Sequence, residues 1–320
     1  MQETSVRANL VPPQVSFTEA LGVWAKIGVL SFGGPAGQIA LMHRILVEER
    51  KWIDEQRFLP ALNFCMLLPG PEATQLATYV GWRMHGIRGG LAAGLLFVLP
   101  GAAVILALSM LYVEFGNVPT IEAAFIGIKA AVLAIVVEAL LRVSRRALHG
   151  GADVAIAVAA FAGIFLLAIP FPIIVAAAAL VGFARGQGQT TLTRAGSERI
   201  AVSTADTLGR IAFWFGVWVL PLLAIAAIFG QDHVLAQIAW FFSKLAVVTF
   251  GGAYAVLAYM AQAAVEGYGW LQPGEMLDGL GLAETTPGPL ILVTEFVGYL
   301  AAYRFGGGNP ILFGILGAMV

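Results

Sequence analysis

The sequence has little charge and almost no cysteine. Only 12% of its 320 residues are Asp, Glu, Lys or Arg, and the formal net charge is −1. Because a nucleic-acid backbone is bound through an excess of basic residues, we expect no nucleic acid among the partners. The one cysteine, Cys65, excludes a disulfide within the chain and cannot form a zinc site alone.

Patterns that carry chemistry are also missing. The four histidines are too widely spaced for a set of ligands, so we expect no metal site. There is no nucleophile–base constellation, no cofactor motif and no G-x-x-x-x-G-K-[ST] sequence for ATP. We therefore expect no enzyme, no catalytic residue and no cofactor, and a membrane-embedded enzyme stays only as an alternative.

Apolar residues are abundant instead. They make up 59% of the chain, and the mean hydropathy is +0.85, as is typical of a polytopic membrane protein. A helix needs roughly 20 apolar residues to cross a bilayer. Three segments reach that length: 89–114, 120–143 and 208–229. Residues 152–184 are too long for one span and contain Pro170 and Pro172, which predicts two short helices in a hairpin.

Two apolar segments are interrupted by the same residues. They are "VLSFGGPAGQIA", residues 29–40, and "VVTFGGAYAVLA", residues 247–258. The motifs lie 218 residues apart, and the same offset aligns Lys26 with Lys244 and one Pro-Gly-Pro sequence with another. Apolar composition alone would not align lysines and Pro-Gly-Pro sequences, so an internal repeat is predicted.

The repeat divides the chain. Residues 1–16 are polar and lack the layout of a secretory signal, so we expect a cytoplasmic tail there. The other expected parts are the first repeat (17–184), a polar cytoplasmic linker (185–206), a connecting transmembrane helix (207–233) and a second repeat shortened at its C-terminus (234–320).

Basic residues are distributed differently in the two halves. Between its two breaks the first half carries Arg44, Arg50, Lys51 and Arg57. The equivalent stretch of the second half, residues 262–278, has no Lys or Arg. Since basic residues gather in short cytoplasmic loops, the halves are predicted to insert in opposite directions. We therefore expect an all-α polytopic protein of the inner (plasma) membrane, with two inverted-topology repeats that each open with two broken or re-entrant helical hairpins.

The breaks themselves suggest an anion site. Non-helical backbone within a bilayer must face protein or a watery cavity. The returning helices are expected to begin with Gly34 or Gly70 as N-cap and with Pro35 or Pro71 at the first helical position. Such helix starts present free N–H groups and partial positive charge, and inverted-repeat transporters use them at the midplane.

The candidate substrate-binding residues lie at the breaks of both halves, together with one lysine in the helix before each FGG motif. They are Lys26, Ser31, Phe32, Gly33, Gly34, Pro69, Gly70, Pro71 and Gln75 in the first half, and Lys244, Thr249, Phe250, Gly251, Gly252, Thr286, Pro287, Gly288 and Pro289 in the second. Close helix packing at Gly-Gly and a simple loop at Pro-Gly-Pro remain alternatives. The lysines can instead extend to the membrane interface.

Five acidic residues and one further lysine need separate interpretation. Glu72, Glu284 and Glu295 are candidates for proton coupling. Glu72 can equally be a helix cap that complements the helix dipole. Lys129 lies at helical spacing from Glu122 and Glu138, which favours a structural ion pair over a substrate contact.

The motifs resemble those of the chromate ion transporter (CHR) family, which consists of bacterial and archaeal membrane proteins with two homologous halves. The resemblance is strongest from "FGGPAGQIALMHRILVEERKWID" through "LLPGPEATQLATYVGWR", and again from "FGGAYAVLAYMAQ" through "AETTPGPLILVTEFVGYLAAYR". It implies export of chromate, with sulfate as a competing oxyanion.

These features predict a secondary transporter that exports chromate or a similar tetrahedral oxyanion, driven by membrane potential or a proton gradient. An inside-negative potential favours exit of a dianion by roughly 4.6 kcal/mol per 100 mV. Uptake or exchange of sulfate or another oxyanion, and a non-transporting scaffold, are the alternatives. The expected partners are the oxyanion and the lipid bilayer, and the sequence leaves open whether the chain forms a homodimer.

Overall fold

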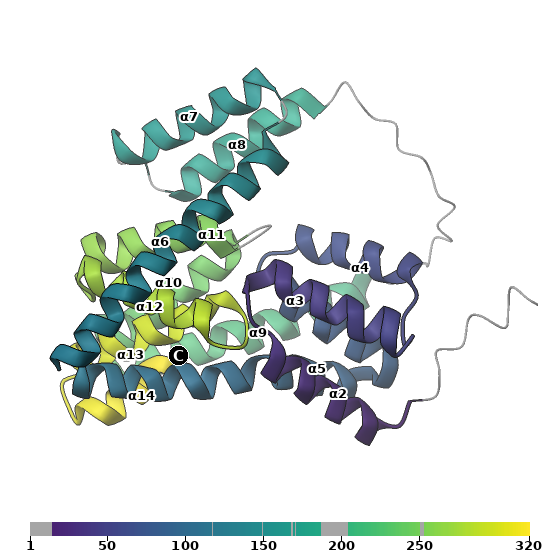
Figure 1. Cartoon of the computed structure of the whole chain (residues 1–320), viewed down its shortest axis with the longest axis horizontal. Helices are drawn as coiled ribbons and strands as arrows, with labels where there is room; N and C mark the ends of the chain where they lie inside the picture. Colours follow the sequence, from purple (N-terminus) through teal and green to yellow (C-terminus); the bar gives the residue numbers. More distant parts are fainter. Residues whose placement is uncertain are drawn as a thin grey trace, which may run out of the picture. The chain divides into compact units, whose positions relative to one another are not determined.

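The computed structural model describes residues 15–116, 118–148, 150–167, 169, 171–186, 204–249 and 253–320 (Figure 1). In these residues every regular element is a helix and no β-strand occurs. The prediction of an all-α protein is thus confirmed. Two compact units are present, one formed by the chain up to Val136 together with Trp240–Val320, and one formed by Val137–Ala239.

The larger unit contains the elements around the predicted breaks of both halves. From the first half these are α2 (Phe17–Leu30), α3 (Gly34–His43), the π-helical turn η1 (Arg44–Glu49), α4 (Glu55–Leu67), α5 (Glu72–Phe115) and the first part of α6 (Pro119–Ala147). From the second half they are most of α10 (Val234–Val248), α11 (Ala253–Gln262), the π-helical turn η2 (Ala263–Gly267), α12 (Pro273–Thr285), the 3-10 turn η3 (Leu290–Leu292), α13 (Val293–Phe305) and α14 (Pro310–Met319).

The elements recur at the offset read from the sequence. Helix α12 begins and ends 218 residues after α4, and η2 falls where the offset places η1. After each π-helical turn the chain passes through a left-handed residue, Lys51 with φ 54° and Gly269 with φ 65°. The next residue then donates back into the turn, Trp52 to Leu46 and Trp270 to Ala264, each at 2.8 Å. Equivalent sequences therefore adopt the same local structure.

Helix α5 contains a bend. Gly86 has φ 60° and ψ −150°, a conformation that essentially only glycine adopts, and His85 is also non-helical. The bend separates a first part that follows the Pro-Gly-Pro break from the long apolar part that the sequence predicts as a span at 89–114.

Small residues let the helices of the first half approach closely. A side chain at Gly28 of α2 would overlap the backbone carbonyl of Leu96 in α5, and one at Gly81 would overlap that of Gly89. Trp24, Ile27 and Phe97 are fully or almost fully buried beside these contacts. Close glycine packing thus occurs in this fold at glycines outside the FGG motif, and it also occurs at Gly288 of the second Pro-Gly-Pro sequence, which lies against Gly101 of α5.

The smaller unit holds the predicted hairpin. Residues 152–184 form two helices, α7 (Gly151–Phe165) and α8 (Phe171–Gly186), as expected from Pro170 and Pro172 in this segment. They are followed by α9 (Thr204–Phe229). By length and apolar composition, α5 and Thr207–Phe229 of α9 qualify as membrane-spanning helices among the described residues, while α7, α8, α10 and α14 are shorter apolar helices.

The helix starts after the first-half breaks differ by one residue from the prediction. Gly33, with φ 82°, is the N-cap of α3, so Gly34 is already the first helical residue. Pro71 has ψ 109° and is the N-cap of α5, which begins at Glu72. The predicted N-caps Gly34 and Gly70 therefore lie one residue away from the N-caps of the structure. Gly34 itself has φ 69°, so both glycines of the first break leave the right-handed helical conformation.

Candidate functional site at the helix breaks

The breaks of the two halves contact each other through their backbones. The N–H of Gly288 donates to the carbonyl of Ser31, and the N–H of Gly70 donates to the carbonyl of Thr249, both at 2.8 Å. Ser31 and Thr249 are equivalent positions in the repeat, as are Gly70 and Gly288. The FGG break of each half is therefore joined to the Pro-Gly-Pro break of the other by the same contact.

The hydroxyl groups at this junction are engaged with their own helices. Ser31 Oγ donates to the carbonyl of Ile27, and Thr249 Oγ1 to that of Leu245, each at 2.6 Å. Thr286 Oγ1 likewise donates to Leu282 at 2.5 Å. Because a hydroxyl has a single proton, these groups cannot also donate to a substrate oxygen in this conformation.

Gln38 links the two halves and was missed by the sequence analysis. Its Nε2 lies 2.5 Å from the carbonyl oxygen of Gly288 and 3.4 Å from that of Ser31. The residue is fully buried on α3, one turn after the FGG break. Its repeat equivalent is Val256, so the alignment of the halves gave no sign of it. A lone glutamine in an apolar helix was the available signal.

Gln75 has a similar arrangement at the other break. Its Nε2 donates to the carbonyl of Pro69 at 2.6 Å. Together the two glutamines therefore cover carbonyl oxygens of Ser31, Pro69 and Gly288, whose negative ends would otherwise repel an anion at the breaks.

Several polar atoms near the breaks are buried without a hydrogen-bond partner. Among the described residues they include the Oε1 atoms of Gln38 and Gln75, Thr74 Oγ1 and Glu295 Oε2. An unsatisfied buried polar atom costs about 1–3 kcal/mol. Such a concentration is typical of a polar site rather than of a close-packed core.

The first-half breaks are more open than the described second-half break. Phe32 is 48% exposed, and a Cβ atom on Gly33 would meet no atom within 4 Å. By contrast, Gly288 is buried and packs against Gly101 of α5. Pro69 is exposed, Gly70, Pro71 and Pro287 are half-buried, and Gly34 and Pro289 are buried. Phe250, Gly251 and Gly252 lie outside the described residues.

The predicted lysines do not lie among the buried polar atoms of the breaks. Lys26 on α2 and Lys244 on α10 are both exposed. Residues beside Lys26, such as Trp24 and Ile27, are buried instead, so the lysine occupies the outer face of α2.

The three predicted carboxylates occupy different environments. Glu72 is 7% exposed in the first turn of α5, where its charge complements the helix dipole. Glu295 is half-buried in the first turn of α13 and has the unpartnered oxygen noted above. Glu284 is half-buried near the end of α12.

A second polar cluster was also missed. Asp278 of α12 is 3% exposed, and its Oδ2 accepts a hydrogen bond from Tyr112 Oη at 2.8 Å and lies 3.2 Å from Lys129 Nζ. The sequence predicted partners for Lys129 within its own helix, whereas the structure pairs it with α12. One turn away, Glu275 makes two hydrogen bonds with Arg304, at 2.5 and 2.8 Å.

These features define a helical protein whose broken helices meet in a polar junction. The family model described as "Chromate transporter" matches residues 18–183 and 236–320, and the chain belongs to this family. The predicted family membership is confirmed. Membership of this family means that the chain is a membrane protein of a transporter family and not of an enzyme family.

Three relatives illustrate the similarity. The chromate transport protein of Pseudomonas aeruginosa is 35% identical over 309 residues, which are 95% of this chain and 71% of that protein. The probable chromate transport protein of Synechococcus elongatus is 30% identical, over 91% of this chain and 71% of its own. The chromate transport protein of Cupriavidus metallidurans is 29% identical, over 91% and 69%. No solved structure matches the chain.

Proposed function

We propose that this chain is a secondary transporter that carries chromate, or a similar tetrahedral oxyanion, out of the cell across the inner membrane. The observation that carries the proposal is the paired backbone contact of Ser31 with Gly288 and of Thr249 with Gly70. It joins the helix breaks of both halves, as a midplane site between repeats requires.

The binding groups in this proposal are backbone N–H groups at the starts of α3 and α5. Each start presents N–H groups without intrahelical partners and about half a positive charge, and α3 presents one N–H group fewer because Pro35 has none. The open space at Gly33 lets an anion approach the backbone closely. Gln38 and Gln75 also favour anion binding, because their amide groups donate hydrogen bonds to nearby carbonyl oxygens that would otherwise repel the anion.

The two halves are proposed to insert in opposite directions. A two-fold relation between the halves is supported by the reciprocity of the two hydrogen bonds. The opposite orientation rests on the four basic residues between the first-half breaks, which the second half lacks.

The export of the anion is proposed to be driven by the membrane potential, and Glu295 is proposed to take up a proton during transport. A dianion gains roughly 4.6 kcal/mol per 100 mV by leaving an inside-negative cell. The half-buried carboxyl group of Glu295 lies six residues after Pro289, the end of the Pro-Gly-Pro break, and has an oxygen without a partner. Glu72 and Glu284 are the alternative positions.

The test is flux into liposomes that contain the purified chain. Radiolabelled chromate, sulfate and phosphate are offered in turn at a fixed potential, with protein-free liposomes as the control. The proposal predicts electrogenic movement of chromate, and faster sulfate movement would reassign the substrate. Absence of movement of all three anions would leave a non-transporting scaffold and overturn the proposal.

A further inference from the structure

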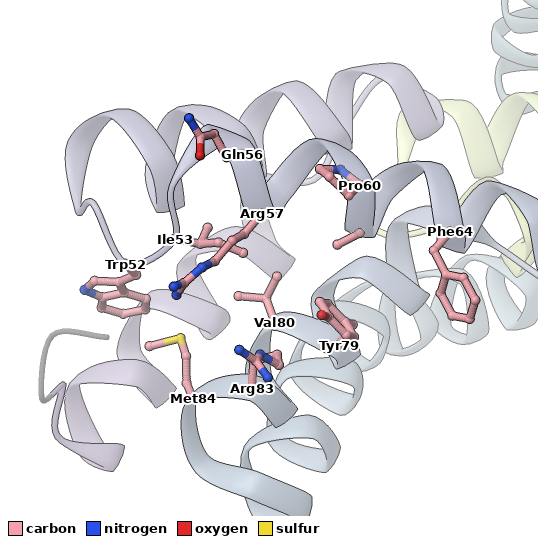
Figure 2. Close-up of a pocket in the computed structure, with 11 residues that line it drawn as sticks. Trp52, Ile53, Gln56, Arg57, Pro60, Phe64, Tyr79, Val80, Arg83 and Met84 are labelled. Carbon is pink, nitrogen blue, oxygen red and sulfur yellow. The ribbon is translucent and has the colours of Figure 1, made fainter. Parts of the chain in front are cut away.

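A separate pocket lies between α4 and the first part of α5, away from the breaks. It has a volume of about 410 Å³. Its lining side chains come from two stretches of the chain, one between Trp52 and Phe64 and the other between Tyr79 and Met84. Figure 2 shows Arg57 from α4 and Arg83 from α5 extending into the same space. Trp52 and Met84 lie at one end of the pocket, and the ring of Tyr79 lies at the side.

The two arginines are incompletely neutralised. Arg57 Nε lies 3.4 Å from Asp54 Oδ2, and Asp54 is also the N-cap of α4, where Oδ1 accepts the Arg57 N–H at 2.8 Å. Arg83 makes no ion pair or hydrogen bond with the residues that the structure describes. The pocket therefore carries a net positive charge, with planar guanidinium groups suited to paired oxygens.

The second half has an ion pair in the region that corresponds to this pocket. The repeat equivalent of Arg57 is Glu275, and Arg304 stands one helical turn after the equivalent of Arg83. There Glu275 and Arg304 form a two-fold hydrogen-bonded ion pair. In the first half an arginine stands where the second half has this carboxylate, so the charged side chains that line the first-half pocket, Arg57 and Arg83, are both cations.

We infer that the pocket binds a tetrahedral oxyanion between Arg57 and Arg83. The anion supplies the oxygens that Glu275 supplies in the second half, and two guanidinium groups can each hold two of them. The inference rests on the proposed function for its role, which is to collect the substrate before it reaches the breaks. The same chemistry fits a free oxyanion and the phosphate of a lipid headgroup, and the experiment separates these sources.

The experiment measures radiolabelled sulfate binding to the full chain in neutral detergent. The variants are Arg57→Gln, Arg83→Gln and Arg57→Lys, with Arg88→Gln as a matched control because Arg88 is exposed on α5 outside the pocket. For a free oxyanion we expect at least tenfold weaker binding in both glutamine variants, a smaller loss in Arg57→Lys, and no change in Arg88→Gln. Thermal unfolding of each variant checks that the fold is retained.

A second arm measures phosphatidylglycerol retained by the purified protein from liposomes of stated composition. If the occupant is a lipid phosphate, the glutamine variants retain less of this lipid while sulfate binding stays the same. Unchanged sulfate binding together with unchanged lipid retention overturns the inference. Should the wild type bind sulfate at Arg57 and Arg83 yet move no anion, the inference stands and the proposed function fails.

Discussion

The carbonyl oxygen of Ser31 accepts a hydrogen bond at 2.8 Å from the N–H of Gly288, a residue in the other half of the chain. The equivalent bond between Thr249 and Gly70 has the same length. Because both bonds are made by backbone atoms, side-chain substitutions act on them only through local conformation. Glycines with positive φ are therefore the sensitive positions of the junction.

Gly288→Ala should destabilise the protein. Gly288 has φ 100°, and an added Cβ would lie 3.0 Å from Leu292 Cδ1 and near Gly101. Backbone strain of this kind costs about 1–3 kcal/mol. The measurement is thermal unfolding in detergent, with Gly22→Ala as the control because a Cβ there meets no atom within 4 Å and Gly22 lies in α2. Equal unfolding temperatures for the two variants would show that the junction is not held in this conformation.

Gln38→Leu should lower transport more than it lowers stability. The substitution exposes the carbonyl oxygens of Gly288 and Ser31 to the proposed anion and leaves them without the amide donor. We expect at least a tenfold loss of chromate flux and a destabilisation of about 1–3 kcal/mol.

Gln237→Leu is the matched control for this change. Gln237 also donates its amide to a backbone carbonyl, that of Asp232 at 3.0 Å, but near the start of α10. Its flux should stay within about twofold of the wild type. A comparable loss in both variants would remove Gln38 from the site.

The pair formed by Asp278 and Lys129 should show strong coupling in a double-mutant cycle. Asp278→Asn or Lys129→Met alone leaves one charge without its partner, and losing a charged hydrogen bond of this kind costs about 1.5–3 kcal/mol. The double variant should lose less stability than the sum of the single variants. Denaturant unfolding measures this difference, and simple additivity would contradict the ion pair.

Glu295→Gln should separate the two driving forces. If Glu295 takes up the coupling proton, the variant keeps flux driven by potential but loses its response to a pH gradient. Glu266→Gln is the control, because Glu266 is exposed on η2. Flux in Glu295→Gln that still follows the pH gradient would move the coupling role to another carboxylate.

The sequence predicted well those features that depend on local pattern. Pro170 and Pro172 marked the hairpin of α7 and α8, and the glycines and prolines at Gly33 and Pro71 marked helix starts to within one residue. Loss of helical conformation is caused by the residues at the break itself, so a local signal was sufficient.

Contacts between distant segments were beyond the reach of the sequence. Spacing along one helix showed the possible partners of Lys129 within α6, but its partner Asp278 is on α12. Gln38 binds across the junction and has no repeat equivalent. Arg304 is paired with Glu275, a partner 29 residues away in the sequence that the counting of charged residues could not identify.

The central claim is that an oxyanion occupies the open space at the first FGG break. It is tested most directly by chromate flux at fixed potential in Gly33→Val and Gly307→Val. Both glycines have positive φ, 82° and 75°, and neither has an atom within 4 Å of an added Cβ, so both variants carry similar backbone strain. The account predicts that Gly33→Val loses at least nine-tenths of the flux while Gly307→Val keeps most of it. Equal flux in the two variants would contradict it.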